Sequence, residues 1–183
     1  MIIDHIAYRS LDRNKTSSFL CKLYDYTIQD EFWLDFQDGS KARCYSLGPK
    51  DKYEFPYTYY YPYQGFNPPQ PDIPLIYHKP PEFFVSEGEE GSIVWNWLKA
   101  KGIESGVHHV ALSVDSVRDT IKWCKDNKMC EFSTEEPIWC ESEGLLQIFT
   151  KEVPELGHVI EFIERKGKGF CNNNIKILIE SSK

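Results

Sequence analysis

The sequence predicts an α+β fold in which two βαβββ modules build one cupped, eight-stranded mixed sheet. Three observations support this prediction. One strand, one helix and then further strands follow each other twice along the chain. The first strand of each series carries a matching motif, "HIAY" from His5 and "HVAL" from His109. When the motifs are overlaid, Phe19 falls opposite Trp123 in the helices that follow. Such an internal repeat indicates two copies of one supersecondary unit.

Length and charge limit the classes of protein to which the chain can belong. Its 183 residues suffice for one domain, with a first module at 1–80, a linker and short helix at 81–105, and a second module at 106–183. The net charge of −7 argues against nucleic acid or an acidic membrane surface as a partner. No apolar run reaches the roughly 18 residues that a membrane-spanning helix needs.

The N-terminus and the cysteines predict a cytoplasmic location. "MIIDHIAYRS" has neither a basic flank nor a long apolar stretch, so we expect no signal peptide. The cysteines form no C-x-x-C pair and no compact framework. We therefore expect reduced, mostly buried thiols at all six positions: Cys21, Cys44, Cys124, Cys130, Cys140 and Cys171.

The first module begins with the alternating strand "IIDHIAY". Asp12 is a candidate cap for a helix whose apolar face holds Phe19, Leu20 and Leu23. Two strand-like segments follow, "YTIQDEFWLDF" and "ARCYSLG", separated by the turn signal "QDGSK". Residues 53–71 are rich in tyrosine and proline, and "IPLIYH" at 73–78 resumes as a strand.

The second module repeats this order after a linker, "PPEFFVSEGEEGS", and a short helix from Ser92 to Gly102. The strand "HHVALSV" leads to a capping box formed by Ser116 and Asp119. Val117, Ile121 and Cys124 then share one helical face. Three further strands are expected in "PIWCES", "LLQIFTK" and "HVIEFIER".

The adjacent histidines, His108 and His109, pose the question of which one is chemical. Neighbouring side chains on a strand point to opposite faces, so at most one belongs to a given site. The repeat matches His109 with His5, and each is followed two residues later by a small alanine on the same face. We therefore expect His5 and His109 to line a cleft and His108 to lie on the far side. The alternate residues Ile6, Tyr8, Val110 and Leu112 should pack beneath the helices.

Glu161 stands within an apolar strand, between "VI" and "FI". Burying an isolated carboxylate costs several kcal/mol unless a cation or metal compensates. Two histidines and one carboxylate form the facial set of non-haem Fe(II) oxygenases. The alternatives are that His5 is an ordinary histidine of a terminal strand and that Glu161 faces outward from an edge strand.

These motifs resemble the vicinal oxygen chelate superfamily, which includes glyoxalases, methylmalonyl-CoA epimerases and extradiol dioxygenases. The resemblance is strongest to the catalytic domain of the 4-hydroxyphenylpyruvate dioxygenase family. It is carried by "GVHHVALSV", "LLQIFTKEV", "VIEFIERKGKGF" and "NNIKILIE", and by "IDHIAYRS" at the N-terminus. These segments cover about a third of the chain.

The resemblance implies roles for particular residues. It implies metal ligands at His5, His109 and Glu161, a substrate-facing amide at Gln147 and an aromatic pocket wall at Phe170. Gln147 could instead be an ordinary polar strand residue, and Phe170 a core residue. Asn174 and Lys176 match the pattern and are expected to be structural, whereas Cys171 and Ile175 replace a glycine and a phenylalanine of the family.

The epimerase and glyoxalase branch uses a fourth ligand, a glutamate on the last strand of the first module. The corresponding position here is expected at Ile76, which argues against a four-ligand site, although His78 lies nearby. The dioxygenases continue into a C-terminal helix that covers the active site, whereas this sequence ends at "ESSK". We therefore expect an open cleft, or one closed by the tyrosine-rich segment 53–71.

The first functional expectation is a metal-dependent, Fe(II) dioxygenase-like oxidoreductase acting on O₂ and a small 2-oxo acid or similar chelating substrate. Zn(II), Ni(II), Co(II) and Mn(II) are the alternative metals. One alternative function is a non-redox glyoxalase- or epimerase-type lyase or isomerase. Another is a small-molecule-binding resistance protein without turnover. The sequence is also compatible with a homodimer.

Overall fold

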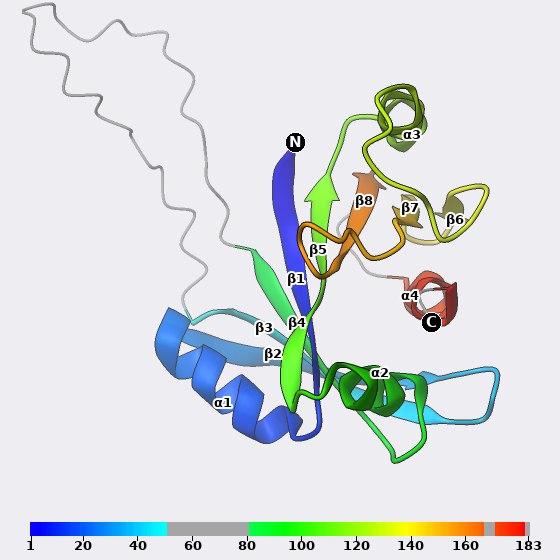
Figure 1. Ribbon diagram of the computed structural model, residues 1–183. Helices are drawn as coiled ribbons and strands as arrows, with labels where there is room; N and C mark the ends of the chain where they lie inside the picture. The colour runs from blue at the N-terminus through cyan, green and yellow to red at the C-terminus, as the bar shows by residue number, and fades with distance from the viewer. Residues whose placement is uncertain (51–80, 167–170, 182–183) are drawn as a thin grey trace, which may run out of the picture.

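The computed structural model describes residues 1–50, 81–166 and 171–181, and for 172 and 173 only the backbone. Eight strands form one mixed sheet in the order β2-β3-β4-β1-β5-β8-β7-β6 (Figure 1). The strands are β1 Ile2–Ser10, β2 Tyr26–Asp35, β3 Lys41–Pro49, β4 Glu82–Gly88, β5 Ser105–Ser113, β6 Ile138–Cys140, β7 Leu145–Phe149 and β8 Val159–Arg165. The helices are α1 Arg13–Tyr24, α2 Ile93–Lys101, α3 Val117–Asp126 and α4 Asn172–Ser181.

The predicted two-module repeat is confirmed by the sheet order. β1 pairs with β5 in the middle, and on each side the first, fourth, third and second strands of one module follow outward. The two helices that follow the central strands match residue by residue. Asp12 and Ser116 cap α1 and α3 through bonds from the amides of Lys15 and Asp119. The buried residues of α1 (Arg13, Ser17, Leu20) and of α3 (Val117, Ile121, Cys124) occupy corresponding positions.

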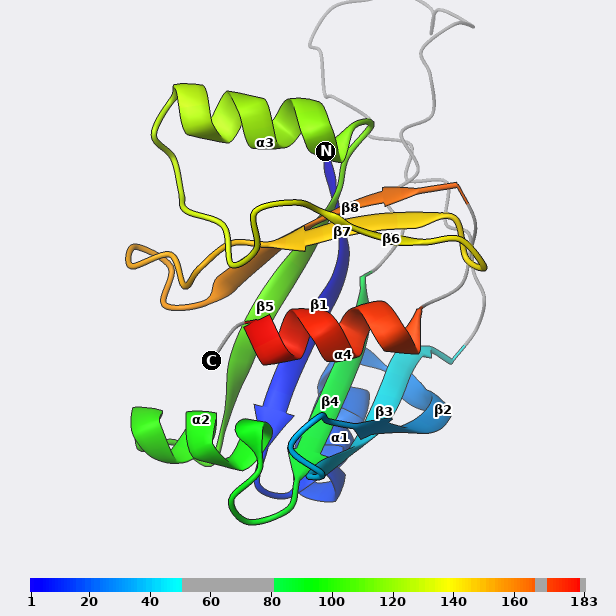
Figure 2. The same cartoon turned by 90° about the vertical axis from the view of Figure 1, so that its right-hand side faces the viewer.

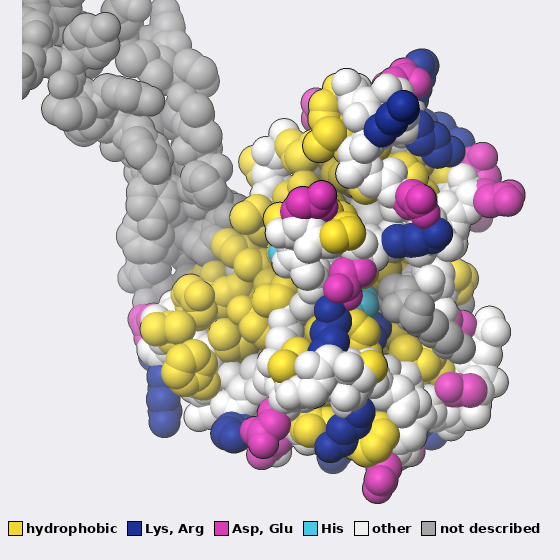
Figure 3. Space-filling model, in the orientation of Figure 1, with side chains coloured by type: hydrophobic (Ala, Val, Ile, Leu, Met, Phe, Trp, Pro, Cys, Tyr) yellow, Lys and Arg dark blue, Asp and Glu magenta, His cyan; other side chains and the backbone are white. Residues whose placement is uncertain are grey.

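The buried face of α1 differs from the prediction at two positions. Leu20 is buried as expected, but Phe19 and Leu23 are 64% and 60% exposed. Arg13 turns toward the sheet instead, because its guanidinium stacks on the ring of Tyr45 at 4.0 Å and pairs with Glu31 at 2.5 Å. Hydrophobic side chains consequently gather on the surface of this part of the molecule (Figure 3).

The prediction that residues 80–92 form a linker is wrong for its central part, because Glu82–Gly88 forms β4. This strand lies inside the sheet, parallel to β1 and antiparallel to β3. Phe83 and Val85 pack in the core beneath α1, while Phe84 and Ser86 line the opposite face. The strand pattern of β4 consists of only four residues, "FFVS", and the glutamates and glycine around them are untypical of a strand.

The sheet is cupped and open, not closed into a barrel, because β2 and β6 end the strand order without pairing with each other. Helices α1 and α3 cover one face, with Leu20 packing on β4 and Ile121 on β7 and β8. Helices α2 and α4 lie on the other face, and α4 crosses in front of β1, β4 and β5 (Figure 2).

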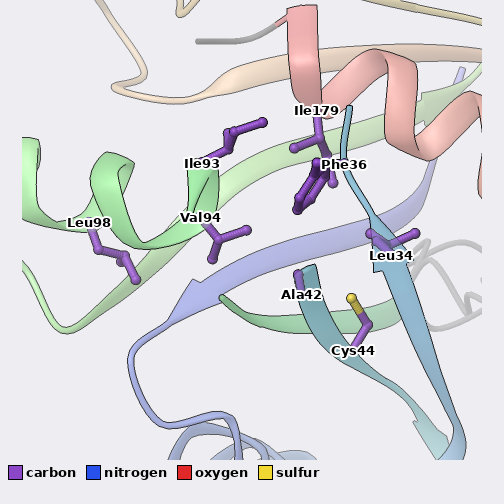
Figure 4. Packing of buried hydrophobic residues seen from close by; sticks show 8 residues of the cluster. All are labelled: Leu34, Phe36, Ala42, Cys44, Ile93, Val94, Leu98 and Ile179. Carbon is purple, nitrogen blue, oxygen red and sulfur yellow. The ribbon is translucent and has the colours of Figure 1, made fainter. Parts of the chain in front are cut away.

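Helix α4 lies over the cleft, a position that the sequence did not predict for the segment "NNIKILIE". Ile179 of α4 lies against Phe36, and both join Ile93, Val94 and Leu98 in one core cluster with residues of β2 and β3 (Figure 4). Ile175, Leu178 and Ile179 also line the cavity of the cleft. The segment "NNIKILIE" therefore itself provides the cover.

The expectation of six reduced cysteines is wrong for one pair. Cys140 at the end of β6 and Cys171 just before α4 form a disulfide, while Cys21, Cys44, Cys124 and Cys130 are free. The two bonded residues are 31 positions apart in sequence and pack with Leu145 and Ile163. Sequence spacing could not reveal the pair, because only the folding of α4 against β6 brings the two residues together.

Three expectations fall on residues outside the described ranges: the tyrosine-rich segment 53–71, the strand at 73–78 and Phe170. Among the described helices, none is both long and apolar enough to cross a membrane.

Candidate metal centre

Three side chains meet at the centre of the sheet, as predicted. His5 lies on β1, His109 on the neighbouring β5 and Glu161 on β8, beside β5. All three are buried, and their ligand atoms form a group that could hold a metal ion. The alternative of an outward-facing Glu161 on an edge strand is therefore excluded, because β8 lies between β5 and β7.

The ligand atoms form a nearly equilateral triangle. His5 Nε2 lies 3.2 Å from His109 Nε2 and 3.2 Å from Glu161 Oε2, and His109 Nε2 lies 3.4 Å from the same oxygen. For ligands about 2.1 Å from a metal, neighbouring ligand atoms are about 3.0 Å apart in octahedral and about 3.4 Å apart in tetrahedral geometry. The triangle therefore fits one face of either coordination shell, and the donor set suits a divalent transition metal.

A carboxylate orients His5 from behind. His5 Nδ1 donates to Asp4 Oδ1 at 2.8 Å, which leaves Nε2 facing the triangle. Arg165 binds both oxygens of Asp4, at 2.7 and 2.8 Å. Carboxylate partners of this kind fix the tautomer of a ligand histidine and raise its basicity. Asp4 and Arg165 are not predicted from the sequence, although Asp4 directly precedes His5 as His108 precedes His109.

The protonation states of the two histidines determine how the triangle could bind a cation. Burial by itself lowers the pKa of His5, but hydrogen bonds to the carboxylates of Asp4 and Glu161 outweigh it and raise the pKa to about 9. Burial lowers the pKa of His109 well below its usual value, and the charges of His5 and Arg9 lower it further. One proton on His5 thus balances Glu161, and a bound metal would replace it.

The second oxygen of Glu161 is held by a chain of amides. Gln147 on β7 donates from Nε2 to Glu161 Oε1 at 2.6 Å, and Asn174 on α4 donates from Nδ2 to Gln147 Oε1 at 2.9 Å. This leaves Glu161 Oε2 for the triangle. Gln147 also lines the cavity, so its amide connects the carboxylate of Glu161 with the cavity wall.

The expectation that His108 lies on the far face is wrong. Ala7 pairs with His109 but Tyr8 pairs with Val107, so the register shifts and His108 is the extra residue of a β-bulge. A bulge re-aims side chains and suspends the strict alternation of faces. His108 therefore lines the same cavity as His109, with the two Nδ1 atoms 2.9 Å apart.

The place of a fourth ligand is taken by Phe84. Glu161 pairs with Ala111 on β5, and in the first module Phe84 pairs with the corresponding Ala7 on β1. The predicted equivalent, Ile76, lies outside the described residues, and within the described part of the first module the strand that pairs with β1 in this way is β4. Phe84 packs edge-on against His5, with ring centroids 5.0 Å apart, and offers no ligand atom. A four-ligand site is therefore disfavoured at this position too.

A small cavity adjoins the triangle under α4. Its volume is about 50 Å³, enough for a few water molecules. The wall is mostly aromatic and aliphatic, and besides the histidines its polar members include Arg9, Ser86 and Gln147. Arg9 is 2% exposed, stacks on Trp97 at 5.2 Å, and has its pKa lowered to about 9 by burial.

Comparison with solved structures identifies the architecture. A mutant 4-hydroxymandelate synthase from Streptomyces coelicolor matches with a TM-score of 0.70 at 18% identity, over 98% of this chain and 52% of that chain. A methylmalonyl-CoA epimerase matches with a TM-score of 0.58 at 19% identity, over 90% of this chain and 95% of that one. The chain has the vicinal oxygen chelate fold.

A third structure agrees with this assignment. The Streptomyces coelicolor methylmalonyl-CoA epimerase in complex with 2-nitronate-propionyl-CoA matches with a TM-score of 0.56 at 18% identity, over 91% of this chain and 99% of that one. The chain thus spans about half the length of the synthase and nearly all of the epimerases. Neither a protein-family model nor a curated protein sequence matches the chain.

Proposed function

We propose that this protein is a metal-dependent oxidoreductase, Fe(II) dioxygenase-like, that acts on O₂ and a small 2-oxo acid or similar chelating substrate. The observation that carries the proposal is the three-ligand triangle of His5, His109 and Glu161 with Phe84 in the place of a fourth ligand. A metal held on one face by two histidines and one carboxylate keeps other positions available for substrate oxygens and O₂.

The residues of the chain have distinct parts in this proposal. Asp4 and Gln147 hold the ligands His5 and Glu161 in place. The apolar wall beneath α4 limits the water beside the triangle to a few molecules, and a substrate that displaced them would strengthen electrostatic interactions there and protect reactive species. The buried guanidinium of Arg9 gives one part of the wall a positive charge, which suits an acidic substrate.

The second candidate is a non-redox lyase or isomerase, in which His5, His109 and Glu161 would hold a divalent metal that supplies Lewis-acid chemistry. The observation in its favour is the match to the methylmalonyl-CoA epimerases, which extends over 95% of the length of one of them. The same metal centre serves both candidates, so metal preference and O₂ consumption separate them.

The test begins with anaerobic titration of the purified protein with Fe(II). We expect one metal per chain, with binding lost in His5→Ala, His109→Ala and Glu161→Ala. His158→Ala serves as the matched control, because His158 is not one of the ligands and its side chain bonds the carbonyl of Leu156, outside the triangle. Adding 2-oxo acids should produce a new absorption band. After O₂ is admitted, the amount of O₂ consumed should be proportional to the amount of product.

Other outcomes identify the rivals. Metal binding without such a band or O₂ consumption, together with isomerisation supported by Ni(II), Co(II) or Zn(II), would establish the lyase or isomerase. Tight binding of a small molecule without turnover would indicate a sequestering protein. Absence of metal binding in the folded wild-type protein would refute all the metal-dependent candidates.

A further inference from the structure

The two ligand histidines are supported in the same way by the residue that precedes each of them. In the pairing of β1 with β5, the register shifts once between Ile3 and His5 and once between Ala7 and Tyr8. The first shift makes Asp4 the extra residue of a bulge, and the second does the same for His108. Each bulge turns the extra residue toward the following histidine: Asp4 meets Nδ1 of His5 at 2.8 Å, and His108 meets Nδ1 of His109 at 2.9 Å.

The supporting groups differ in chemistry. Asp4 is a carboxylate paired with Arg165, so it can only accept the hydrogen of His5 Nδ1. His108 is an imidazole, 2% exposed, packed edge-on against Trp97 and beside Phe149. A neutral imidazole has one donor and one acceptor nitrogen, so the contact between His108 and His109 can run in either direction.

Only one direction is compatible with a metal at the triangle. If His108 Nδ1 donated, the hydrogen of neutral His109 would sit on Nε2 and block the ligand position. If His109 Nδ1 donates, its Nε2 keeps a lone pair directed at His5 Nε2 and Glu161 Oε2, 3.2 and 3.4 Å away. His108 then carries its own hydrogen on Nε2.

We infer that His108 is a positioning residue whose Nδ1 accepts the Nδ1 hydrogen of His109, and thereby holds His109 in the tautomer that binds metal through Nε2. The inference rests on the proposed metal centre. It assigns to His108 the part that Asp4 has in the other module, with a neutral acceptor in place of a charged one. Partners of this kind typically change metal affinity 10- to 100-fold when they are removed.

Two substitutions test the hydrogen bond apart from packing. His108→Leu removes the acceptor, and we expect the dissociation constant for Co(II) to rise roughly 10- to 100-fold. His108→Asn restores an acceptor, and its reach is suitable because Asp4, of the same length, bonds His5 at 2.8 Å from the corresponding position. We therefore expect His108→Asn to bind Co(II) within a few-fold of wild type. Trp97→Phe, which alters the packing on His108 and Arg9 but keeps the hydrogen bond between His108 and His109, should leave the affinity unchanged.

Long-range ¹H–¹⁵N spectra of histidine-labelled protein provide a second readout that requires no metal. We expect the hydrogen of His109 on Nδ1 in the wild-type protein, and a mixture of tautomers in His108→Leu. Equal Co(II) affinity in wild type and His108→Leu, or failure of the folded His108→Asn to restore it, would overturn the inference. So would a wild-type spectrum with the hydrogen on His109 Nε2. If wild type binds no metal but His109 shows the Nδ1 hydrogen, the proposed function fails while the inferred hydrogen bond stands.

Discussion

At the residue scale, Asp4 and Arg165 illustrate how a charge pair can serve a neighbouring ligand. Arg165 comes from β8, the strand of Glu161, and reaches across to Asp4 on β1 with two hydrogen bonds. The pair is largely buried, and the pKa of Asp4 is lowered well below its usual value despite burial, because His5 and Arg165 stabilise the carboxylate. Asp4 is therefore ionised and accepts from His5 at neutral pH.

Asp4→Asn should weaken metal binding without unfolding the protein. The amide keeps the shape of the side chain but removes the charge that orients His5 and raises its basicity, so we expect roughly 10- to 100-fold weaker Co(II) binding. Asp126→Asn is the matched control, because Asp126 belongs to an exposed ion pair with Lys122. An affinity for Co(II) equal to that of the control would show that Asp4 has no part in the metal centre.

Gln147→Leu distinguishes the two roles that the sequence left open for this residue. Its amide donates to Glu161, so we expect the substitution to weaken Co(II) binding as well as the binding of a 2-oxo acid to the metal complex. Isothermal titration of each in turn measures both effects. Loss confined to the 2-oxo acid would assign Gln147 to the substrate alone, and no change in either would make it an ordinary strand residue.

At the element scale, the sequence predicted what depends on local pattern and missed what depends on pairing. The N-cap and buried face of α3 follow from the spacing of Ser116, Val117 and Ile121, and the structure confirms them. The bulge at His108 is invisible in the sequence because it arises from the register of β5 against β1. The cover provided by α4 was missed for the same reason, since a helical pattern does not state which cleft it crosses.

The disulfide beside α4 gives an element-scale prediction. Cys140→Ser should lower the free energy of unfolding by about 3–4 kcal/mol, since the bond closes a loop across 31 positions. It should also speed hydrogen exchange in α4 while leaving Co(II) affinity intact, because the three ligands lie on strands. Cys130→Ser, at a free thiol, is the control. Unchanged exchange in α4 would show that packing alone holds this helix.

At the scale of the whole molecule, the internal two-fold relation explains both the site and its asymmetry. The repeat of "HIAY" and "HVAL" matches His5 with His109 from the sequence alone, because corresponding positions of two copies of one unit occupy equivalent places. The repeat could not locate the residue of the first module that corresponds to Glu161, because the segment that forms β4 is rich in acidic residues and does not show a clear strand pattern. The structure supplies that position as Phe84, through equivalent pairings with Ala7 and Ala111.

Phe84→Glu should therefore convert the three-ligand site into a four-ligand site. Without metal, a second buried carboxylate next to His5 loses its hydration and adds like-charge repulsion at the triangle, so we expect the melting temperature in EDTA to fall below wild type. With Co(II) or Zn(II), the added ligand should tighten binding at least tenfold and reverse the loss of stability. The extra ligand should also compete with 2-oxo acids for the metal and weaken their binding. Phe84→Gln is the control, because glutamine has the shape of glutamate without its charge. Metal affinity in Phe84→Glu no higher than in this control would show that the two modules do not place these residues equivalently around the metal.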